Sequence, residues 1–214
     1  MYTDYYYGFA GKIGAGEYGR DSYSNDNNLP LIRVPDDKPT LQEAVNELAE
    51  TGGIIELTAN DYYFETPVIH IEEGKYLEIR AAEKKMPLIV LNGTVSILAN
   101  ENSTLVFNGL FFTGGGLHVP ANKPGGFLNE LGLLELQHCT ISPDGSLEIA
   151  GNPAQAPQPG IVIETTGTTC KIQNSIVSPI INHEINFCEI SNSILDALDE
   201  NEWAYKGLED FGGE

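Results

Sequence analysis

Cys170-Lys171-Ile172-Gln173-Asn174-Ser175-Ile176-Val177 is a stretch of eight residues that returns, 18 residues later, as Cys188-Glu189-Ile190-Ser191-Asn192-Ser193-Ile194-Leu195. Both copies place apolar residues at the first, third and seventh positions and Asn at the fifth. Such alternation of apolar and polar residues is typical of a β-strand. A repeat this short leaves no room for a helix between the copies, so it predicts strands stacked as the rungs of a solenoid.

Looser copies of the same pattern precede these two, at 134–141, at 105–112 and, in part, at 77–81. The third position of the pattern falls at residues 79, 107, 136, 172 and 190, so the copies are unevenly spaced. Uneven spacing with a constant strand motif indicates coils of fixed cross-section with loops inserted between the strands. Because crossovers between parallel strands are almost always right-handed, we predict an all-β fold, a single-stranded right-handed parallel β-helix.

The cysteines agree with stacked strands. Cys170 and Cys188 share the first position of the pattern and are therefore expected to be neighbours on adjacent rungs. Adjacent strands lie about 4.8 Å apart, a Cα separation that a disulfide allows. Free thiols filling an apolar core fit the pattern better, and three cysteines are too few for a disulfide framework. The small number of cysteines and their expected free state predict synthesis in the reducing cytoplasm.

One helix is predicted, at 40–51. Thr40-Leu41-Gln42-Glu43 has the form of a capping box, in which two side chains satisfy backbone donors at the start of a helix. Thr51-Gly52-Gly53 supplies its end. A single apolar stripe follows at helical spacing, formed by Leu41, Ala44, Val45 and Leu48. A helix of this kind just before the first rungs would cover the open end of the core.

A length of 214 residues suggests one domain. Residues 1–30 read as an irregular arm rich in Tyr and Gly, residues 31–195 as the β-helix with its capping helix, and residues 196–214 as an acidic segment without a further rung. Two long loops are expected, at 120–130 and 142–160. Short strands are expected at 54–57, 62–64, 67–71, 76–80, 88–91, 95–98, 104–112, 116–119 and 161–164.

The charge balance excludes several partners. The chain has 11 basic and 31 acidic residues, a net charge of −20, so nucleic acid and anionic membrane surfaces would repel it. No stretch has the roughly 18 apolar residues that a membrane span needs, and the first residues lack the pattern of a secretory signal. We therefore expect cytoplasmic synthesis without a signal peptide, no nucleic-acid partner and no membrane insertion.

No catalytic, cofactor-binding or metal-binding residue can be assigned from the sequence. The histidines at 70, 118, 138 and 183 are dispersed and lack metal-site spacing. The acidic candidates Asp61, Glu72-Glu73 and Glu164 include no pair of the kind that glycosidases use, and the first two read as turns. The oxygen-rich segment 21–28 lacks the Gly and the final acid of a calcium loop.

The paired asparagines of the repeat, Asn174 and Asn192, are interpreted as an inward or turn-facing stack in which amide bonds to amide. Their alternative reading is a pair of exposed polar rungs. The sequence as a whole leaves the question of enzymatic activity open and favours a protein that is not an enzyme, with no cofactor.

The segment from Leu41 through Val119 resembles the opening of the pectin lyase-like superfamily of right-handed β-helices, through its helix, Gly52-Gly53-Ile54-Ile55-Glu56-Leu57 and Leu77-Glu78-Ile79-Arg80-Ala81-Ala82. The enzymes of that superfamily carry Gly-His-Gly, Arg-Ile-Lys or Arg-rich calcium motifs that are absent from this sequence. Residues 134–143, 173–177, 191–197 and 8–14 are similar to an uncharacterised bacterial β-helix family associated with contractile, phage-tail-like injection particles. That resemblance carries fold motifs and no catalytic residues.

Two classes of function follow. The first is a non-catalytic structural or interaction module of a bacterial tail-like or surface assembly, released or cell-associated, whose partners are protein subunits or further copies of itself. The alternative is a β-helix that binds or degrades polysaccharide, with Tyr62-Tyr63 or Phe111-Phe112 stacking on sugar rings. An exposed apolar end or arm would favour the first class, and a pair of carboxylates on one face would favour the second.

Overall fold

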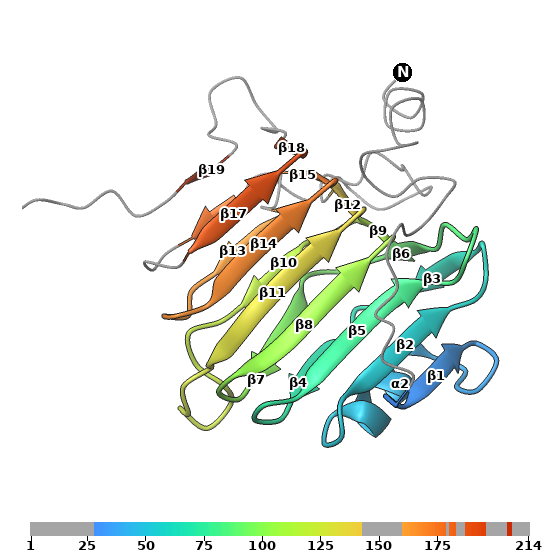
Figure 1. Ribbon diagram of the computed structural model, residues 1–214, viewed down its shortest axis with the longest axis horizontal. Helices are drawn as coiled ribbons and strands as arrows, with labels where there is room; N and C mark the ends of the chain where they lie inside the picture. Colours follow the sequence, from blue (N-terminus) through green and yellow to red (C-terminus); the bar gives the residue numbers. More distant parts are fainter. Residues whose placement is uncertain (1–27, 143–159, 179, 183–186, 196–204, 207–214) are drawn as a thin grey trace, which may run out of the picture.

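The computed structural model describes residues 28–142, 160–178, 180–182, 187–195 and 205–206. These residues form three parallel β-sheets, which we call A, B and C, and one short helix (Figure 1). The chain visits the sheets in the order A, B, C and then returns to A, and we call each such circuit a coil. The predicted all-β class is confirmed. The oxygen-rich segment 21–28, which lacks the pattern of a calcium loop, lies, except for Asn28, outside the described residues, as does most of the loop 142–160.

Each sheet contains one strand from every complete coil, and sheet A also contains β1. Sheet A has seven strands: β1 (Leu31–Val34), β2 (Gly53–Leu57), β5 (Tyr76–Ala81), β8 (Ser103–Asn108), β11 (Leu131–Gln137), β14 (Thr169–Gln173) and β17 (Cys188–Ser191). Sheet B has six: β3 (Tyr62–Phe64), β6 (Leu88–Val90), β9 (Phe111–Thr113), β12 (Thr140–Ser142), β15 (Ile176–Val177) and β18 (Ile194–Leu195). Sheet C has six: β4 (Val68–Ile71), β7 (Val95–Ala99), β10 (Leu117–Val119), β13 (Ile161–Ile163), β16 (Ile180–Asn182) and β19 (Tyr205–Lys206).

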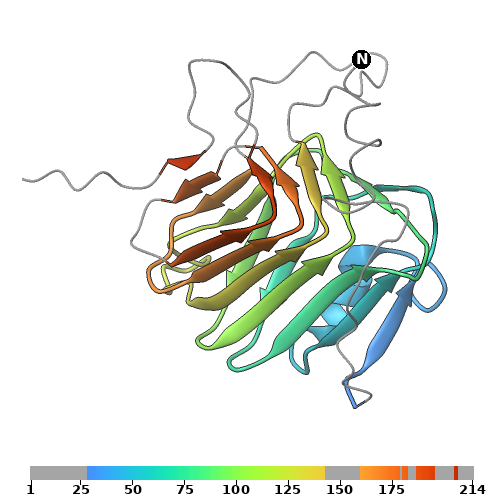
Figure 2. The same cartoon turned by 45° about the horizontal axis from the view of Figure 1, so that its top comes forward.

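The core lies between the three sheets, which surround a common interior (Figure 2). The third position of the sequence repeat forms one inward-facing column in sheet A, in continuous parallel register: Ile55, Ile79, Phe107, Leu136, Ile172 and Ile190. The column predicted at residues 79, 107, 136, 172 and 190 is therefore confirmed. All of its members are at most 1% exposed except Ile190, in the last coil, which is 37% exposed.

The helix α2 (Leu41–Leu48) covers the first coil, where it packs against β1, β2 and β4. Its start is capped by the Thr40 side chain, which accepts a hydrogen bond from the Glu43 amide (3.2 Å). The Glu65 carboxylate accepts two more, from the amides of Leu41 (3.0 Å) and Gln42 (3.1 Å), and its negative charge suits the helix N-terminus. The predicted apolar stripe joins the common core, so the predicted position of the helix is confirmed.

The corner from sheet A to sheet B is a two-residue turn in the later coils. Its first residue has a left-handed backbone at Gly109 (φ +74°), His138 (+52°), Asn174 (+50°) and Asn192 (+47°). Asn192 Nδ2 donates to Asn174 Oδ1, so the predicted amide stack is confirmed, in its turn-facing form. Glycine and asparagine tolerate this conformation, which explains why Asn recurs at this position of the repeat.

Two expectations about strands differ from the structure. The strand expected at 104–112 is two strands, β8 and β9, because Gly109 turns the chain from sheet A into sheet B. The segment 196–214 was expected to hold no rung, but β19 within it pairs in parallel with β16 (Ile180 with Tyr205 and Ile181 with Lys206). A two-residue strand is too short to show a period in the sequence.

Cys170 and Cys188 are register partners on β14 and β17, and both are free thiols, as predicted. The hydrogen bond between these thiols raises the pKa of the buried Cys170. Cys139 lies in the corner between β11 and β12 and is fully buried. Its burial raises the pKa of its thiol from the ordinary 9.0 to about 12.

This shift predicts a loss of stability at high pH. A thiol whose pKa is higher in the folded than in the unfolded chain stabilises the fold below pH 9, and that contribution is lost as the pH rises from 9 towards 12. Between pH 8 and 10.5 the free energy of unfolding should fall by about 2 kcal/mol more in the native chain than in Cys139→Ala. Urea unfolding of both proteins at the two pH values measures the difference, and equal losses would contradict the prediction.

Candidate functional site

The loop 120–130, between β10 and β11, folds as a hairpin that projects from the stack. Asn122 and Leu128 form an isolated antiparallel bridge, and the Lys123 amide donates to the Phe127 carbonyl (2.7 Å). Its tip is a type II turn with Pro124 at the second position and Gly125 (φ +91°) at the third. The Gly126 amide closes that turn by donating to the Lys123 carbonyl (3.1 Å).

Two side chains fix this hairpin loop to the end of β7. Asn129 is 3% exposed; its Oδ1 accepts from the Ala99 amide (2.7 Å), and its Nδ2 donates to the carbonyls of Ile97 and Pro120 (2.8 Å each). Lys123 Nζ donates to the Ala99 carbonyl (3.1 Å) and to Asn100 Oδ1. The hairpin loop is thus held at its base and displays two large apolar side chains at its tip, Phe127 (70% exposed) and Leu128 (64%).

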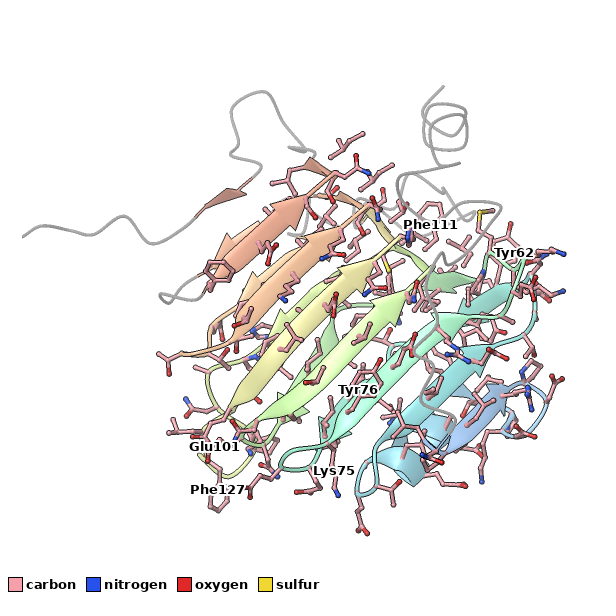
Figure 3. All side chains as sticks on the ribbon, viewed as in Figure 1. Tyr62, Lys75, Tyr76, Glu101, Phe111 and Phe127 are labelled. Atoms are coloured by element: carbon pink, nitrogen blue, oxygen red, sulfur yellow. The ribbon has the colours of Figure 1, made fainter. Side chains whose placement is uncertain are left out.

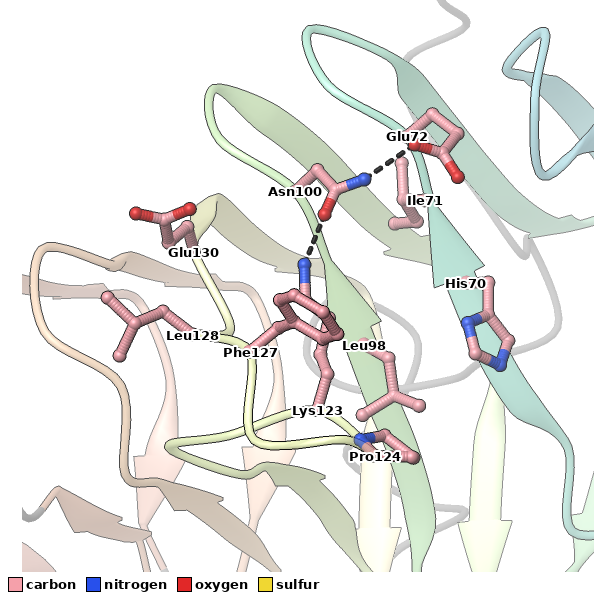
Figure 4. Close-up of a pocket in the computed structure, with 10 residues that line it drawn as sticks. All are labelled: His70, Ile71, Glu72, Leu98, Asn100, Lys123, Pro124, Phe127, Leu128 and Glu130. Atoms are coloured by element: carbon pink, nitrogen blue, oxygen red, sulfur yellow. Dashed lines mark hydrogen bonds between the residues drawn. The ribbon is translucent and has the colours of Figure 1, made fainter.

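A cleft of about 640 Å³ separates this hairpin loop from sheet C (Figure 4). Its apolar wall includes Leu98 of β7 together with Phe127 and Leu128. Its polar lining consists of His70, Glu72, Asn100, Lys123 and Glu130. Asn100 joins two of these groups, because its Nδ2 donates to Glu72 Oε2 and its Oδ1 accepts from Lys123 Nζ. The cleft is therefore built before any ligand arrives.

A second cleft, of about 430 Å³, lies on the other side of the hairpin loop and shares Leu128 and Glu130 with the first. It also includes Glu101 and Glu164. In Figure 3, Glu101 and Phe127 lie at the same edge of the stack. Carboxylates therefore border the hairpin loop on both sides.

Two residues considered separately in the sequence come together beside the second cleft. His118 of β10 and Glu164, which follows β13, approach to 3.1 Å between Nε2 and Oε2, with both side chains about one-third exposed. Their strands are parallel register neighbours. Ser96 is the register neighbour of His118 on β7, but within the described part of the chain no hydrogen bond joins the two side chains. When the histidine is protonated, the two side chains form an ion pair; among the described residues, no hydroxyl or thiol is hydrogen-bonded to His118.

Of the other candidate residues, His70 and Glu72 line the first cleft together, and the other described ones lie elsewhere. Asp61 is a turn residue whose Oδ1 accepts from the Tyr62 amide (2.8 Å). Glu72 begins the predicted turn 72–75, in which the Lys75 amide donates to the Glu72 carbonyl (3.1 Å). His70 lines the first cleft, and His138 sits in the A-to-B corner. His183 lies outside the described residues.

The outer face of sheet A holds an ionic cluster that the sequence did not reveal. Arg80 of β5 lies 3.1 Å from Glu56 of β2 and 3.6 Å from Glu78, and the Tyr76 hydroxyl donates to Glu78 (3.2 Å). Arg80 and Glu78 are almost completely buried. Arg80 thus pairs with both carboxylates, and Arg33 lies 3.6 Å from Glu56 as well, so Glu56 and Glu78 are not an acid and base free for catalysis. The cluster could have been inferred from the alternation along the strands, which puts Glu56, Glu78 and Arg80 on the outward side.

The aromatic pairs of the sequence split between core and surface. Tyr63 and Phe112 face inward and are buried, whereas Tyr62 lies on the outer face of sheet B, 54% exposed. Tyr62 stacks on Phe64, with ring centroids 5.9 Å apart. Leu88 of β6 is the register partner of Tyr62 on one side and of the half-buried Phe111 on the other.

The last coil leaves apolar groups uncovered. Ile190 of β17 occupies the inward column yet is 37% exposed, and Phe187 just before it is 64% exposed. Cys188 and Leu195 pack only partly against the core. Strands β17 and β18 are the last of sheets A and B. We call the group formed by Phe187, Cys188, Ile190 and Leu195 the open end.

Among the described residues, no three His, Cys, Asp or Glu side chains are grouped closely enough to hold a metal ion. The only helix in the described ranges has eight residues, too few to cross a membrane. Compared with known proteins, the chain matches no protein family, no curated protein and no solved structure.

Proposed function

We propose that the three-sheet stack is a right-handed parallel β-helix of the pectin lyase-like kind. The chain passes from A to B to C in the same order in every coil that the structure describes from β2 onward. Every pair of adjacent strands is parallel, and crossovers between parallel strands are right-handed in nearly all proteins. The resemblance of residues 41–119 to the opening of that superfamily supports the same assignment.

We propose further that the protein is a non-catalytic structural or interaction module of a bacterial tail-like or surface assembly. The observation that carries this proposal is the open end. One end of the stack is covered by α2, whereas the other presents Ile190 and Phe187 to solvent beside β17 and β18, the outermost strands of sheets A and B among the described residues. Uncovered strand edges and core side chains pair readily with another chain. Glu56 and Glu78 of sheet A are ion-paired with Arg80, so these two carboxylates do not supply the catalytic pair that the alternative would need.

The test is the mass of the protein in solution. Light scattering is expected to give a dimer or larger assembly for the native chain, with a second copy as the simplest subunit. Ile190→Asp should return the monomer, because a charge in the inward column cannot be buried at an interface. Ser191→Asp is the matched control, since it adds the same charge to the outward side of the same strand. A monomer for the native chain, or equal dissociation by both variants, would remove the open end as the interface.

A second candidate function is the binding of a polysaccharide on sheet B. The stacked, exposed rings of Tyr62 and Phe64 favour it, because aromatic faces offer a flat apolar surface to sugar rings. Tyr62→Ala should then weaken binding of a neutral oligosaccharide about tenfold, whereas Tyr76→Ala, on sheet A, should not. Calorimetric titration measures both, and an unchanged affinity in Tyr62→Ala would exclude this surface.

A further inference from the structure

We propose that the cleft beside the hairpin loop binds a basic, arginine-containing segment of a partner protein. The proposal rests on the function as an interaction module, but it concerns a surface separate from the open end. The lining of this cleft indicates the chemistry of the partner, whereas the side chains of the open end do not.

The edge of the stack where sheet C connects back to sheet A carries mostly negative charge. The connections that lead from sheet C back to sheet A carry five glutamates, which we call the acidic corner: Glu72, Glu73, Glu101, Glu130 and Glu164. The same connections, from β4 through β14, carry two cationic side chains, Lys75 and Lys123. Among the described residues, no Lys or Arg forms an ion pair with Glu72, Glu101 or Glu130. These three carboxylates are exposed and are therefore available to a cation from outside.

An aromatic face stands beside these carboxylates. Phe127 is 70% exposed at the cleft, between Glu72 on one coil and Glu130 on its own hairpin loop. A cation held over an aromatic ring is attracted by the ring and is stabilised further by nearby carboxylates. Arginine suits this arrangement better than lysine, because its planar guanidinium stacks on a ring while its edge donates to a carboxylate.

The cleft is fixed in advance for such a ligand. Four hydrogen bonds of Asn129 and Lys123 hold the hairpin loop on the end of β7 and on Asn100, and a fifth, from Asn129 to the Pro120 carbonyl, lies within the loop. The ammonium of Lys123 is directed to the Ala99 carbonyl and to Asn100, at the base of the hairpin loop. A binding surface that is ordered beforehand loses less entropy on association. The net charge of −20 also attracts a basic segment over a distance.

The test uses a fluorescein-labelled peptide of arginines separated by glycines, and the same peptide with citrulline in place of arginine. Citrulline keeps the shape of arginine and lacks its charge. The binding is measured by fluorescence anisotropy in the Ile190→Asp background, so that failure of the open end as an interface does not affect the result. We expect the arginine peptide to bind at low ionic strength, its affinity to fall as salt is added, and the citrulline peptide to bind at least tenfold more weakly.

Three substitutions locate the site. Phe127→Ala and Glu130→Gln should each weaken the binding of the arginine peptide about three- to tenfold. Glu83→Gln removes a charge from an exposed position in the A-to-B connection, outside the acidic corner, and should leave the affinity within twofold. Circular dichroism of each variant confirms that it folds.

Three results would overturn the proposal. Equal weakening by Glu83→Gln would mean that the peptide senses only the overall charge. Equal binding of the citrulline peptide would mean that no cation is recognised. Binding of a neutral oligosaccharide that is lost in Phe127→Ala, without binding of the arginine peptide, would assign the cleft to a sugar.

Discussion

Replacing Phe107 with alanine is expected to lower the free energy of unfolding by about 3–5 kcal/mol. Phe107 is 1% exposed in the inward column, between Ile79 and Leu136, and its ring meets Phe112 edge-on with centroids 5.2 Å apart. Truncation leaves a cavity in the middle of the stack, where coils on both sides prevent the core from collapsing around it. Urea unfolding followed by circular dichroism gives the change in free energy.

Phe64→Ala is the matched control. Phe64 is 66% exposed on the outer face of sheet B, so the same truncation should cost less than about 0.5 kcal/mol. If Phe107→Ala were no more destabilising than Phe64→Ala, the register that places residues 79, 107 and 136 in one inward column would be wrong.

Replacing Asn129 with alanine is expected to release the hairpin loop from the stack. The change removes three hydrogen bonds and leaves the Ala99 amide and the Ile97 carbonyl without that partner in a largely buried place. Groups of this kind cost about 1–3 kcal/mol each when unsatisfied, and water entering beneath a surface loop offsets part of that cost. We therefore expect a local loss of about 2–4 kcal/mol, seen as faster hydrogen exchange of the Ala99 amide.

The effect should be local. The global free energy of unfolding should change less than the local protection at Ala99, because the strands on either side keep their ladders. Asn122→Ala is the control within the same hairpin loop, since Asn122 is exposed and takes part through its backbone bridge to Leu128. Exchange at Ala99 that is equally fast in both variants, or unchanged in Asn129→Ala, would show that Asn129 does not hold the hairpin loop.

The repeat in the sequence predicted the core well because each inward position is decided locally. Apolar residues at alternate positions, with Asn where the chain turns, specified the column from Ile79 to Ile190 and the pairing of Cys170 with Cys188. The helix was equally predictable from the sequence, because Thr40 and Gly52 mark its ends. Strands of two or three residues, such as β16 and β19, carry too few positions to show a period.

The site was not predictable in the same way. His118 and Glu164 lie in different coils, and their contact depends on how the chain between them closes one coil and begins the next. Lys123 and Asn129 resemble ordinary polar loop residues in the sequence. Nothing in their spacing indicates that Asn129 is buried or that both side chains bond to β7. Phe127 and Leu128 resemble core residues by type, and only the turn at Pro124-Gly125 exposes them. Contacts between loops and strands of separate coils leave no period in a sequence.

The two-residue corner between sheets A and B has a consequence for how this protein can change. From β8 onward, that corner is two residues long and begins with a left-handed residue, whereas four residues join β2 to β3 and six join β5 to β6. The connections from C to A vary from three residues after β7 to eleven after β10. New loops can therefore be grafted after β13, as the hairpin loop stands after β10, while the A-to-B edge keeps one coil aligned with the next. In the later coils, added length is accommodated by the connections from sheet C to sheet A, and alignment is maintained at the corner from sheet A to sheet B.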